Sequence, residues 1–427
     1  MRAGTASVAD DGVNEHVPRR SAPHQPSLAR QPLRRIVLIR YRMTPWWVRV
    51  TVVWALSRIV TTGILLWFAA RQPANAWTGA HPDYVSFAQL WDSTWYHVVA
   101  ASAYPSVLPV DESGHVGENA WAFMPGYPLL VRGLMVITGL PWAPLSVFVS
   151  FAFSLAAALM VYRLMRLVLP GGTALFAVVI FCFAPLSPIL QVSYAESMHV
   201  FLLALALFLL VQRRYVVLIP VIAVMALTRP SGLAFALALA VHAIHRFLTR
   251  TRDPFPLWER ILLVGVTVFS GLMGLAWPFL AWMATGSISA YTDTELAWRA
   301  PYLGYHDLVP FTPWIQGAGF WMPGPLGIVV LIIVVAGFFA FLFTPWVRRI
   351  GVTLRIWVAS YALYLLAVFF PQSSTFRLLV PLFPLAGALA VPRSRIYRVL
   401  LVVVLIAGQW VWCYLAWWID GFDWTPP

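Results

Sequence analysis

From about residue 46 onward, the chain alternates long apolar stretches with short polar segments. Many of the apolar stretches approach 20 residues, the length at which a helix crosses a ~30 Å hydrocarbon core. The pattern predicts about eleven membrane spans. They cover residues 46–69, 143–167, 172–190, 196–212, 215–229, 232–249, 259–284, 325–347, 352–370, 376–391 and 398–418. We therefore expect an all-α polytopic membrane protein whose transmembrane domain covers residues 44–420.

Basic residues gather between these stretches, and all 29 are arginine. Such clusters mark the cytoplasmic ends of membrane helices. The clusters that define this side are Arg163 and Arg166, Arg213 and Arg214, Arg246 to Arg260, Arg348 to Arg355, and Arg393 to Arg398. Residues 1–43 are rich in proline and arginine, which indicates a disordered cytoplasmic tail, and residues 421–427 then form an outer tail. The absence of lysine is typical of a GC-rich genome and favours a bacterial, actinobacterial-type source.

One apolar stretch, residues 124–140, does not fit as a span. If it crossed the membrane, Arg163 and Arg166 would lie outside and every later arginine cluster would invert. Its internal prolines and glycine suit an interfacial or re-entrant helix that packs on protein. We therefore expect a long first outer loop at residues 70–142 and a second, aromatic outer loop at residues 286–324.

The composition excludes several classes of protein. Hydrophobic residues make up 60% of the chain and charged residues 11%, which a soluble domain would not have. The net charge of +13 comes from clusters between spans, so no nucleic-acid partner is expected. Cys182 and Cys413 lie within apolar stretches, which argues against a disulfide. A single Glu-x-x-His, at Glu196 and His199, has no further ligands nearby in the sequence, so no metal site is expected.

The first outer loop carries a carboxylate in an unusual setting. Residues 87–100, FAQLWDSTWYHVVA, have apolar side chains at helical spacing and predict an amphipathic helix in the membrane interface. Asp92 lies at the edge of the apolar stripe, one turn from Tyr96. A carboxylate held there can take a proton from the hydroxyl of a membrane-bound substrate. From periodicity alone, Asp92 can equally solvate the polar face or cap a turn.

Six arginines lie where the positive-inside rule disfavours them, and two of these, Arg71 and Arg132, suit interfacial snorkelling. Arg58 lies within the first span, Arg299 lies in the aromatic outer loop, and Arg229 and Arg377 lie at outer helix ends marked by proline. An arginine at membrane depth is costly and is usually paired or functional. Two interpretations of Arg229 and Arg377 stay open. They can bind an anionic group such as a lipid phosphate, or they can pair with Glu196 or Asp92.

Several motifs occur in an order that resembles a known family. They are W-D-x-x-W-Y-x-x-x-A (Trp91 to Ala100), A-F-M-P-G-Y-P-L (Ala122 to Leu129), S-Y-A-E-S (Ser193 to Ser197), T-R-P-S-G (Thr228 to Gly232) and F-R-L-L-V-P-L-F-P-L (Phe376 to Leu385). This order resembles the PIG-V family of mannosyltransferases, within the GT-C superfamily. The resemblance covers residues 45–240 well and is thinner beyond.

The resemblance implies a GT-C fold with interfacial helices in the first outer loop and an inverting glycosyltransferase in which Asp92 is the general base. It implies a polyprenyl-phosphate sugar donor, with mannose as the expected sugar, and Arg229 and Arg377 as ligands of the donor phosphate. The family's acceptor does not carry over to a bacterial protein, so we expect a lipid-linked sugar or a glycolipid, and a secreted protein stays open. No cofactor is expected, although a divalent cation is not excluded. Residues expected to shape the site are Trp91, Trp95, Tyr96, His97, Tyr127, Tyr194, Glu196, Arg58 and Arg299.

His97 departs from the family pattern, and its role stays open. We place the chain in the plasma membrane, with a cytoplasmic N-terminus and a site on the outer face.

Two other functions remain possible interpretations of the sequence. They are a transporter or flippase of a lipid-linked sugar and a non-catalytic subunit of a glycan assembly complex. Transporters typically show an internal repeat and broken helices at the midplane. The two halves of this sequence show no convincing repeat, and the unusual charges gather at the outer surface rather than at the midplane.

Overall fold

The computed structural model describes residues 43–306, 309–322, 324–419 and 426–427, and the unit considered below is Trp47–Pro427. The predicted tail at 1–43 lies almost wholly outside the described residues, as does most of the predicted tail at 421–427. Regular structure in the described part is helical, apart from an isolated bridge between Val110 and Val116. The prediction of an all-α protein is confirmed.

Among the described residues, four helices are long and apolar enough to cross a membrane. They are α2 (Trp46–Ala69), α6 (Trp142–Arg166), α11 (Leu257–Thr285) and α19 (Arg395–Trp412), the last of which continues as a π-helical turn, η4 (Cys413–Trp417). Seven shorter apolar helices accompany them: α5 (Gly126–Thr138), α7 (Gly171–Phe183), α8 (Glu196–Val211), α9 (Tyr215–Ala226), α10 (Gly232–Leu248), α14 (Pro325–Phe341) and α16 (Val352–Val368). The chain is a helical membrane protein.

The helices pack around α8, nearly all of whose residues are buried. It contacts α6, α9 and α16, while α10 packs between α11 and α16, and α7 packs on α18 (Leu385–Leu389) and α19. In contrast, α2, α11, α14 and α19 expose rows of large apolar side chains. A helix that exposes apolar residues along one side and buries the other side in protein suits a position against lipid.

Proline explains two differences from the predicted spans. The stretch 376–391 is not one helix, because it is divided into α17 (Thr375–Leu378), η3 (Val380–Leu382) and α18. Pro381 and Pro384 lack the N–H that a continuous helix would need there. The stretch 172–190 likewise ends its helix at Phe183, before Pro185, and resumes as η2 (Ser187–Gln191). The first break places irregular backbone beside the site described below, because Leu378, Val380 and Pro381 line its cavity.

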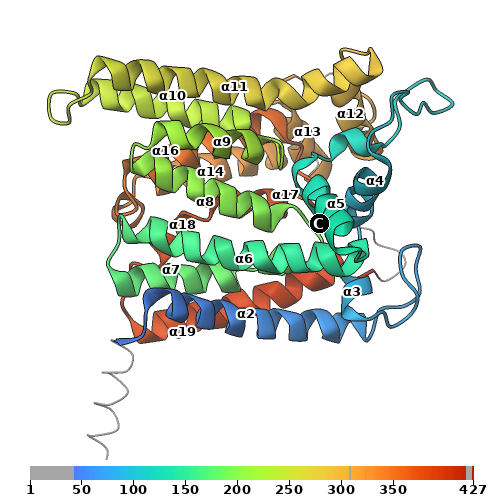
Figure 1. The fold of residues 1–427 in the computed structure, drawn as a ribbon, viewed down its shortest axis with the longest axis horizontal. Coiled ribbons are helices and arrows are strands. Elements are labelled where there is room, and N and C mark those ends of the chain that lie inside the picture. The colour runs from blue at the N-terminus through green and yellow to red at the C-terminus, as the bar shows by residue number, and fades with distance from the viewer. Residues whose placement is uncertain (1–42, 307–308, 323, 420–425) are drawn as a thin grey trace, which may run out of the picture. The chain divides into compact units, whose positions relative to one another are not determined.

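The elements between α2 and α6, together with α12 (Ala290–Leu303) and α13 (Thr312–Trp321), lie at one end of the helices in Figure 1. They include α3 (Tyr84–Phe87), α4 (Asp92–Ser102), η1 (Ala120–Ala122) and α5. The turn between α10 and α11, which carries Arg250 and Arg252, lies at the opposite end (Figure 1). With only 13 residues, α5 is about 20 Å long, short of a hydrocarbon core.

The predicted interfacial helix at 87–100 is interrupted. The turn α3 ends at Phe87 and α4 begins at Asp92, with Trp91 between them at φ 61° and ψ −126°. A positive φ is costly for a side chain of this size, by about 1–3 kcal/mol, and persists only where the surroundings hold it. The break makes Asp92 the first residue of a helix, where a carboxylate is favoured by the helix dipole.

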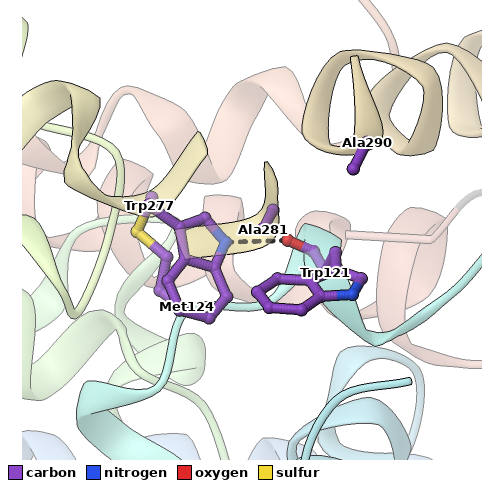
Figure 2. Close-up of a cluster of buried hydrophobic side chains, with 5 residues drawn as sticks. All are labelled: Trp121, Met124, Trp277, Ala281 and Ala290. Atoms are coloured by element: carbon purple, nitrogen blue, oxygen red, sulfur yellow. Dashed lines mark hydrogen bonds between the residues drawn. The ribbon is translucent and has the colours of Figure 1, made fainter. Parts of the chain in front are cut away.

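A cluster of buried apolar side chains fastens the first outer loop to α11 and α12 (Figure 2). Trp121 and Met124 pack against Trp277, Ala281 and Ala290. The indole N–H of Trp277 donates to the carbonyl of Trp121, at 2.8 Å. This cluster fixes η1, and with it the start of α5, against α11 and α12.

Candidate active site

Two ion pairs lie together at the end of the helices that carries the elements between α2 and α6. Arg377 contacts the carboxylate of Asp92, and both side chains are nearly buried, at 12% and 11% exposed. Arg229 contacts the carboxylate of Glu196 at 2.5 Å, with side chains 15% and 5% exposed. The four residues come from separate stretches of sequence, and the structure brings them together as two neighbouring pairs.

Asp92 is held in place by the segment that leads into α8. Its backbone N–H donates to the hydroxyl of Tyr194 at 3.1 Å, and the guanidinium of Arg377 lies over the Tyr194 ring at 5.7 Å. Immediately before Asp92, the carbonyl of Ala88 accepts from the N–H of Ser193 at 3.2 Å, and the Gln89 amide contacts the Ser193 hydroxyl. These hydrogen bonds therefore hold Asp92 against the S-Y-A-E-S segment.

Glu196 and Arg229 each lie at the end of a helix. Glu196 is the first residue of α8, where its charge favours the helix dipole. Arg229 follows the end of α9 and precedes Pro230, which disfavours continued helix. Its second nitrogen, Nη1, donates to the hydroxyl of Tyr96 at 3.2 Å. Arg229 thus connects the first outer loop to α8.

Gly126, in the A-F-M-P-G-Y-P-L motif, sits directly against the T-R-P-S-G segment. Its N–H donates to the carbonyl of Leu227 at 2.8 Å. A Cβ at this position would lie 2.7 Å from Thr228 Oγ1 and 2.8 Å from the Leu227 carbonyl oxygen. Only glycine lets the two backbones approach this closely. The contact sets the position of Arg229, two residues farther on.

Beside the two ion pairs is a small cavity lined by both polar and apolar side chains. Its lining residues are Glu196, His199, Val200, Arg229, Pro230, Ser231, Tyr361, Phe369, Arg377, Leu378, Val380 and Pro381. Two polar atoms of these residues, Glu196 Oε2 and Arg377 Nε, are buried and have no hydrogen-bond partner within the part of the chain that the structure describes. One accepts and one donates, so a ligand bearing both kinds of group would satisfy both atoms.

Aromatic side chains form the wall beneath Asp92. The ring of Tyr96 packs edge-to-face on Phe123, Tyr127 and Tyr194. The Tyr127 hydroxyl donates to the carbonyl of Ser146 at 2.8 Å. Burial raises the pKa of the Tyr96 phenol, so Tyr96 offers a neutral hydroxyl to Arg229.

The remaining residues predicted for the site lie farther from the ion pairs. Trp95 stacks on Phe123, and Trp91 packs against Trp77. His97 is exposed and stacks on Trp142, so the structure does not bring it to the cavity.

Of the remaining arginines, Arg58 is buried and donates to the carbonyls of Cys182 and Ser187, at the break between α7 and η2. Arg299 donates to the carbonyl of Val368 at 2.8 Å, beside the cavity residue Phe369.

Several residues that line or face the site were not among those predicted for it from the sequence. His199 and Ser231, whose side chains are 3.0 Å apart, line the cavity, and so does Tyr361. Glu295 lies near enough to Arg229 and Arg377 to interact with both charges. Their positions follow from the packing of α8, α10, α12 and α16. Ser231 could have been suspected, because it belongs to the T-R-P-S-G motif.

The arrangement can supply a carboxylate to accept a proton and two guanidiniums to bind an anion. Within the described residues, no three His, Cys, Asp or Glu side chains are grouped so as to hold a metal ion.

Comparison with known proteins gives little direct help. No family model matches the sequence, and no curated protein matches it. Among solved structures, the chain is similar to an oligosaccharyltransferase of Archaeoglobus fulgidus in complex with zinc and sulfate. The TM-score is 0.39 and the identity 13%, over 83% of this chain and 52% of that one.

A second structure of the same enzyme, tethered to an acceptor peptide, has a TM-score of 0.38 and 12% identity over 84% and 53% of the two chains. The chain thus spans about half the length of the structures it matches. So distant a likeness leaves the function to be inferred from the site itself.

Proposed function

We propose that the protein is a membrane glycosyltransferase that moves a sugar, with mannose as the expected one, from a polyprenyl-phosphate donor to a lipid-linked or glycolipid acceptor. The proposal rests on one observation: two ion pairs, Asp92–Arg377 and Glu196–Arg229, lie beside one cavity. A carboxylate and two guanidiniums are the groups that sugar transfer from a lipid phosphate requires. The order of motifs that resembles the PIG-V family, and with it a GT-C fold, supports the same chemistry.

In the proposed reaction, Asp92 accepts the proton of an acceptor hydroxyl. The hydroxyl oxygen forms a bond to C1 of the sugar, while the bond between C1 and the phosphate oxygen breaks. The polyprenyl phosphate leaves with that electron pair, and attack from the opposite face inverts C1. Arg229 and Arg377 stabilise the negative charge that develops on the phosphate.

The contact between Arg377 and Asp92 gives donor binding a second consequence. A phosphate bound at Arg377 competes with Asp92 for the same guanidinium. Once Arg377 turns toward the phosphate, the Asp92 oxygen is free to accept a proton. Glu196 keeps Arg229 in place throughout, because their pair is buried and Arg229 also contacts Tyr96.

We place the site on the outer face of the plasma membrane, in a multi-pass chain with its N-terminus in the cytoplasm. The arginine clusters, which favour the cytoplasmic side, fall in the turns α6–α7, α8–α9, α10–α11, α14–α16 and α18–α19. The two ion pairs fall at the ends of α8 and α9 away from those turns and in the segments beyond them. The expected partners are therefore membrane lipids and lipid-carried sugars.

The test is transfer of radiolabelled mannose from synthetic polyprenyl-phosphate mannose into a total lipid extract. Membranes would contain the wild type, Asp92→Asn, or the control Asp111→Asn, whose carboxylate lies on an exposed loop and contacts backbone N–H groups. Asparagine keeps the shape of Asp92 but cannot act as a base. We expect Asp92→Asn to lower the rate about 10²- to 10⁴-fold and Asp111→Asn to leave it unchanged.

Full activity of a folded Asp92→Asn protein would refute the assignment of the base. If the folded wild type transfers no sugar from any member of a polyprenyl-phosphate-sugar panel, but moves a lipid-linked sugar across vesicle membranes, the flippase alternative replaces the proposal.

A further inference from the structure

The helix α12 turns one face toward the site. Trp298 contacts the rings of Trp95 and Phe123, with centroids 5.7 and 5.8 Å apart. Arg299 reaches the carbonyl of Val368, next to the cavity residue Phe369. Two turns earlier, Tyr291 packs against the cluster shown in Figure 2. Residues three and four apart share a face of a helix, so Glu295 lies on this same inward face.

Glu295 is the third carboxyl group of the site. It lies between Tyr291, which forms a hydrogen bond with it, and Arg299 on α12, and it is also within electrostatic reach of Arg229 and Arg377. Tyr364 of α16 interacts with it as well. In the described part of the chain, Glu295 takes part in none of the ion pairs, whereas Asp92 and Glu196 each hold an arginine. Burial raises the pKa of the Glu295 carboxyl, which can then donate as well as accept a hydrogen bond.

This face also carries a donor without a hydrogen-bond partner among the described residues. The indole N–H of Trp298 is buried, and nothing in the described residues accepts from it. It lies beside the stacked rings of Trp95 and Phe123, whose planes differ by 7°. A carboxyl, a guanidinium and an indole N–H beside aromatic faces form a mixed polar and apolar surface. Sugars present the same mixture, because hydroxyls at the rim surround an apolar face.

We propose that the inward face of α12, through Glu295, Trp298 and Arg299, binds the hydroxyls of a sugar ring at the site and sets which sugar is accepted. This inference rests on the proposed glycosyltransferase function. The shared chemistry is a ring carrying several hydroxyls, and it belongs either to the donor sugar or to the headgroup of the acceptor.

The experiment compares wild type with Glu295→Ala, Glu295→Gln and the control Asp293→Asn. Asp293 lies on the same helix two residues earlier, where it accepts from the Ser289 hydroxyl at 2.6 Å. Initial rates would be measured while the donor and the acceptor lipid are varied separately. We expect Glu295→Ala to raise the KM for one of them about 10- to 100-fold, with a smaller change in kcat. Glu295→Gln, which keeps one acceptor and gains donors, should lie between wild type and Glu295→Ala.

A higher KM for the donor assigns the surface to the transferred sugar, and a higher KM for the acceptor assigns it to the headgroup. Unchanged KM values for both substrates in folded Glu295→Ala, with Asp92→Asn inactive, would overturn this inference and leave the proposed function standing. If the wild type shows no transfer, the proposed function fails instead.

Binding can still be compared in that case, using polyprenyl phosphate with and without mannose. Loss of any preference for the mannosylated lipid in Glu295→Ala would retain the surface as a sugar site. An equal preference for the mannosylated lipid in wild type and Glu295→Ala would refute the assignment of this face as a sugar-binding surface.

Discussion

Breaking the Glu196–Arg229 pair offers a sensitive test of the site, because the pair connects α8 to the end of α9 and, through Tyr96, to the first outer loop. The perturbation is a double-mutant cycle of Glu196→Gln, Arg229→Gln and the two together. Removing Glu196 leaves the Arg229 guanidinium, 15% exposed, with the Tyr96 hydroxyl as its remaining hydrogen-bond partner in the described residues.

The size of the effect follows from burial. Removing one partner of a buried ion pair costs about 3–5 kcal/mol, because the other charge stays desolvated. Glutamine still offers a hydrogen bond, so about 3 kcal/mol is expected for each single variant. The double variant has no unpaired charge and should cost less than the sum of the singles by about 1.5–3 kcal/mol.

The assay is reversible unfolding of the purified protein in mixed micelles, followed by the fluorescence of its 22 tryptophans. The chain supplies its own control in the pair of Arg213 and Asp253, whose side chains are 45% and 38% exposed. The same cycle there should give a coupling of less than about 1 kcal/mol. Both Glu196→Gln and Arg229→Gln should also lose sugar transfer, because Arg229 is a proposed phosphate ligand. Additive effects at Glu196 and Arg229, within about 0.5 kcal/mol, would refute the ion pair as a coupled unit.

Two further changes test how the fold supports the site. Gly126→Ala places a Cβ against Thr228 and the Leu227 carbonyl, so it should destabilise the protein by about 1–3 kcal/mol and lower kcat by displacing Arg229. The control is Gly133→Ala, where nothing lies within 4 Å of the added Cβ, and it should leave the stability and the transfer rate unchanged. Arg58→Met leaves the Cys182 and Ser187 carbonyls without this donor, so it should cost about 1–3 kcal/mol of stability in the same unfolding assay. A change in KM without loss of stability would place Arg58 in the site after all.

The sequence predicted the helices well at the three longest apolar stretches. The stretches at 46–69, 143–167 and 259–284 match α2, α6 and α11 within two residues at each end. The stretch at 376–391 was predicted less well, because hydropathy does not register the donors that Pro381 and Pro384 remove. The start of α4 at Asp92 was also missed, since nothing local in FAQLWDSTW announces a positive φ at Trp91.

By itself, the sequence determined that this is a helical membrane protein, because the length and apolarity of its stretches leave no other way to satisfy the backbone. It also singled out Asp92, Glu196, Arg229 and Arg377, because charged groups at membrane depth are costly enough to be conspicuous. It left open whether the arginines pair with the carboxylates or bind an anionic ligand. Only the tertiary structure decided which carboxylate meets which arginine, and that Glu295 faces them from α12. Those contacts join residues far apart in the chain, and their geometry is set by the packing of whole helices, which no local pattern encodes.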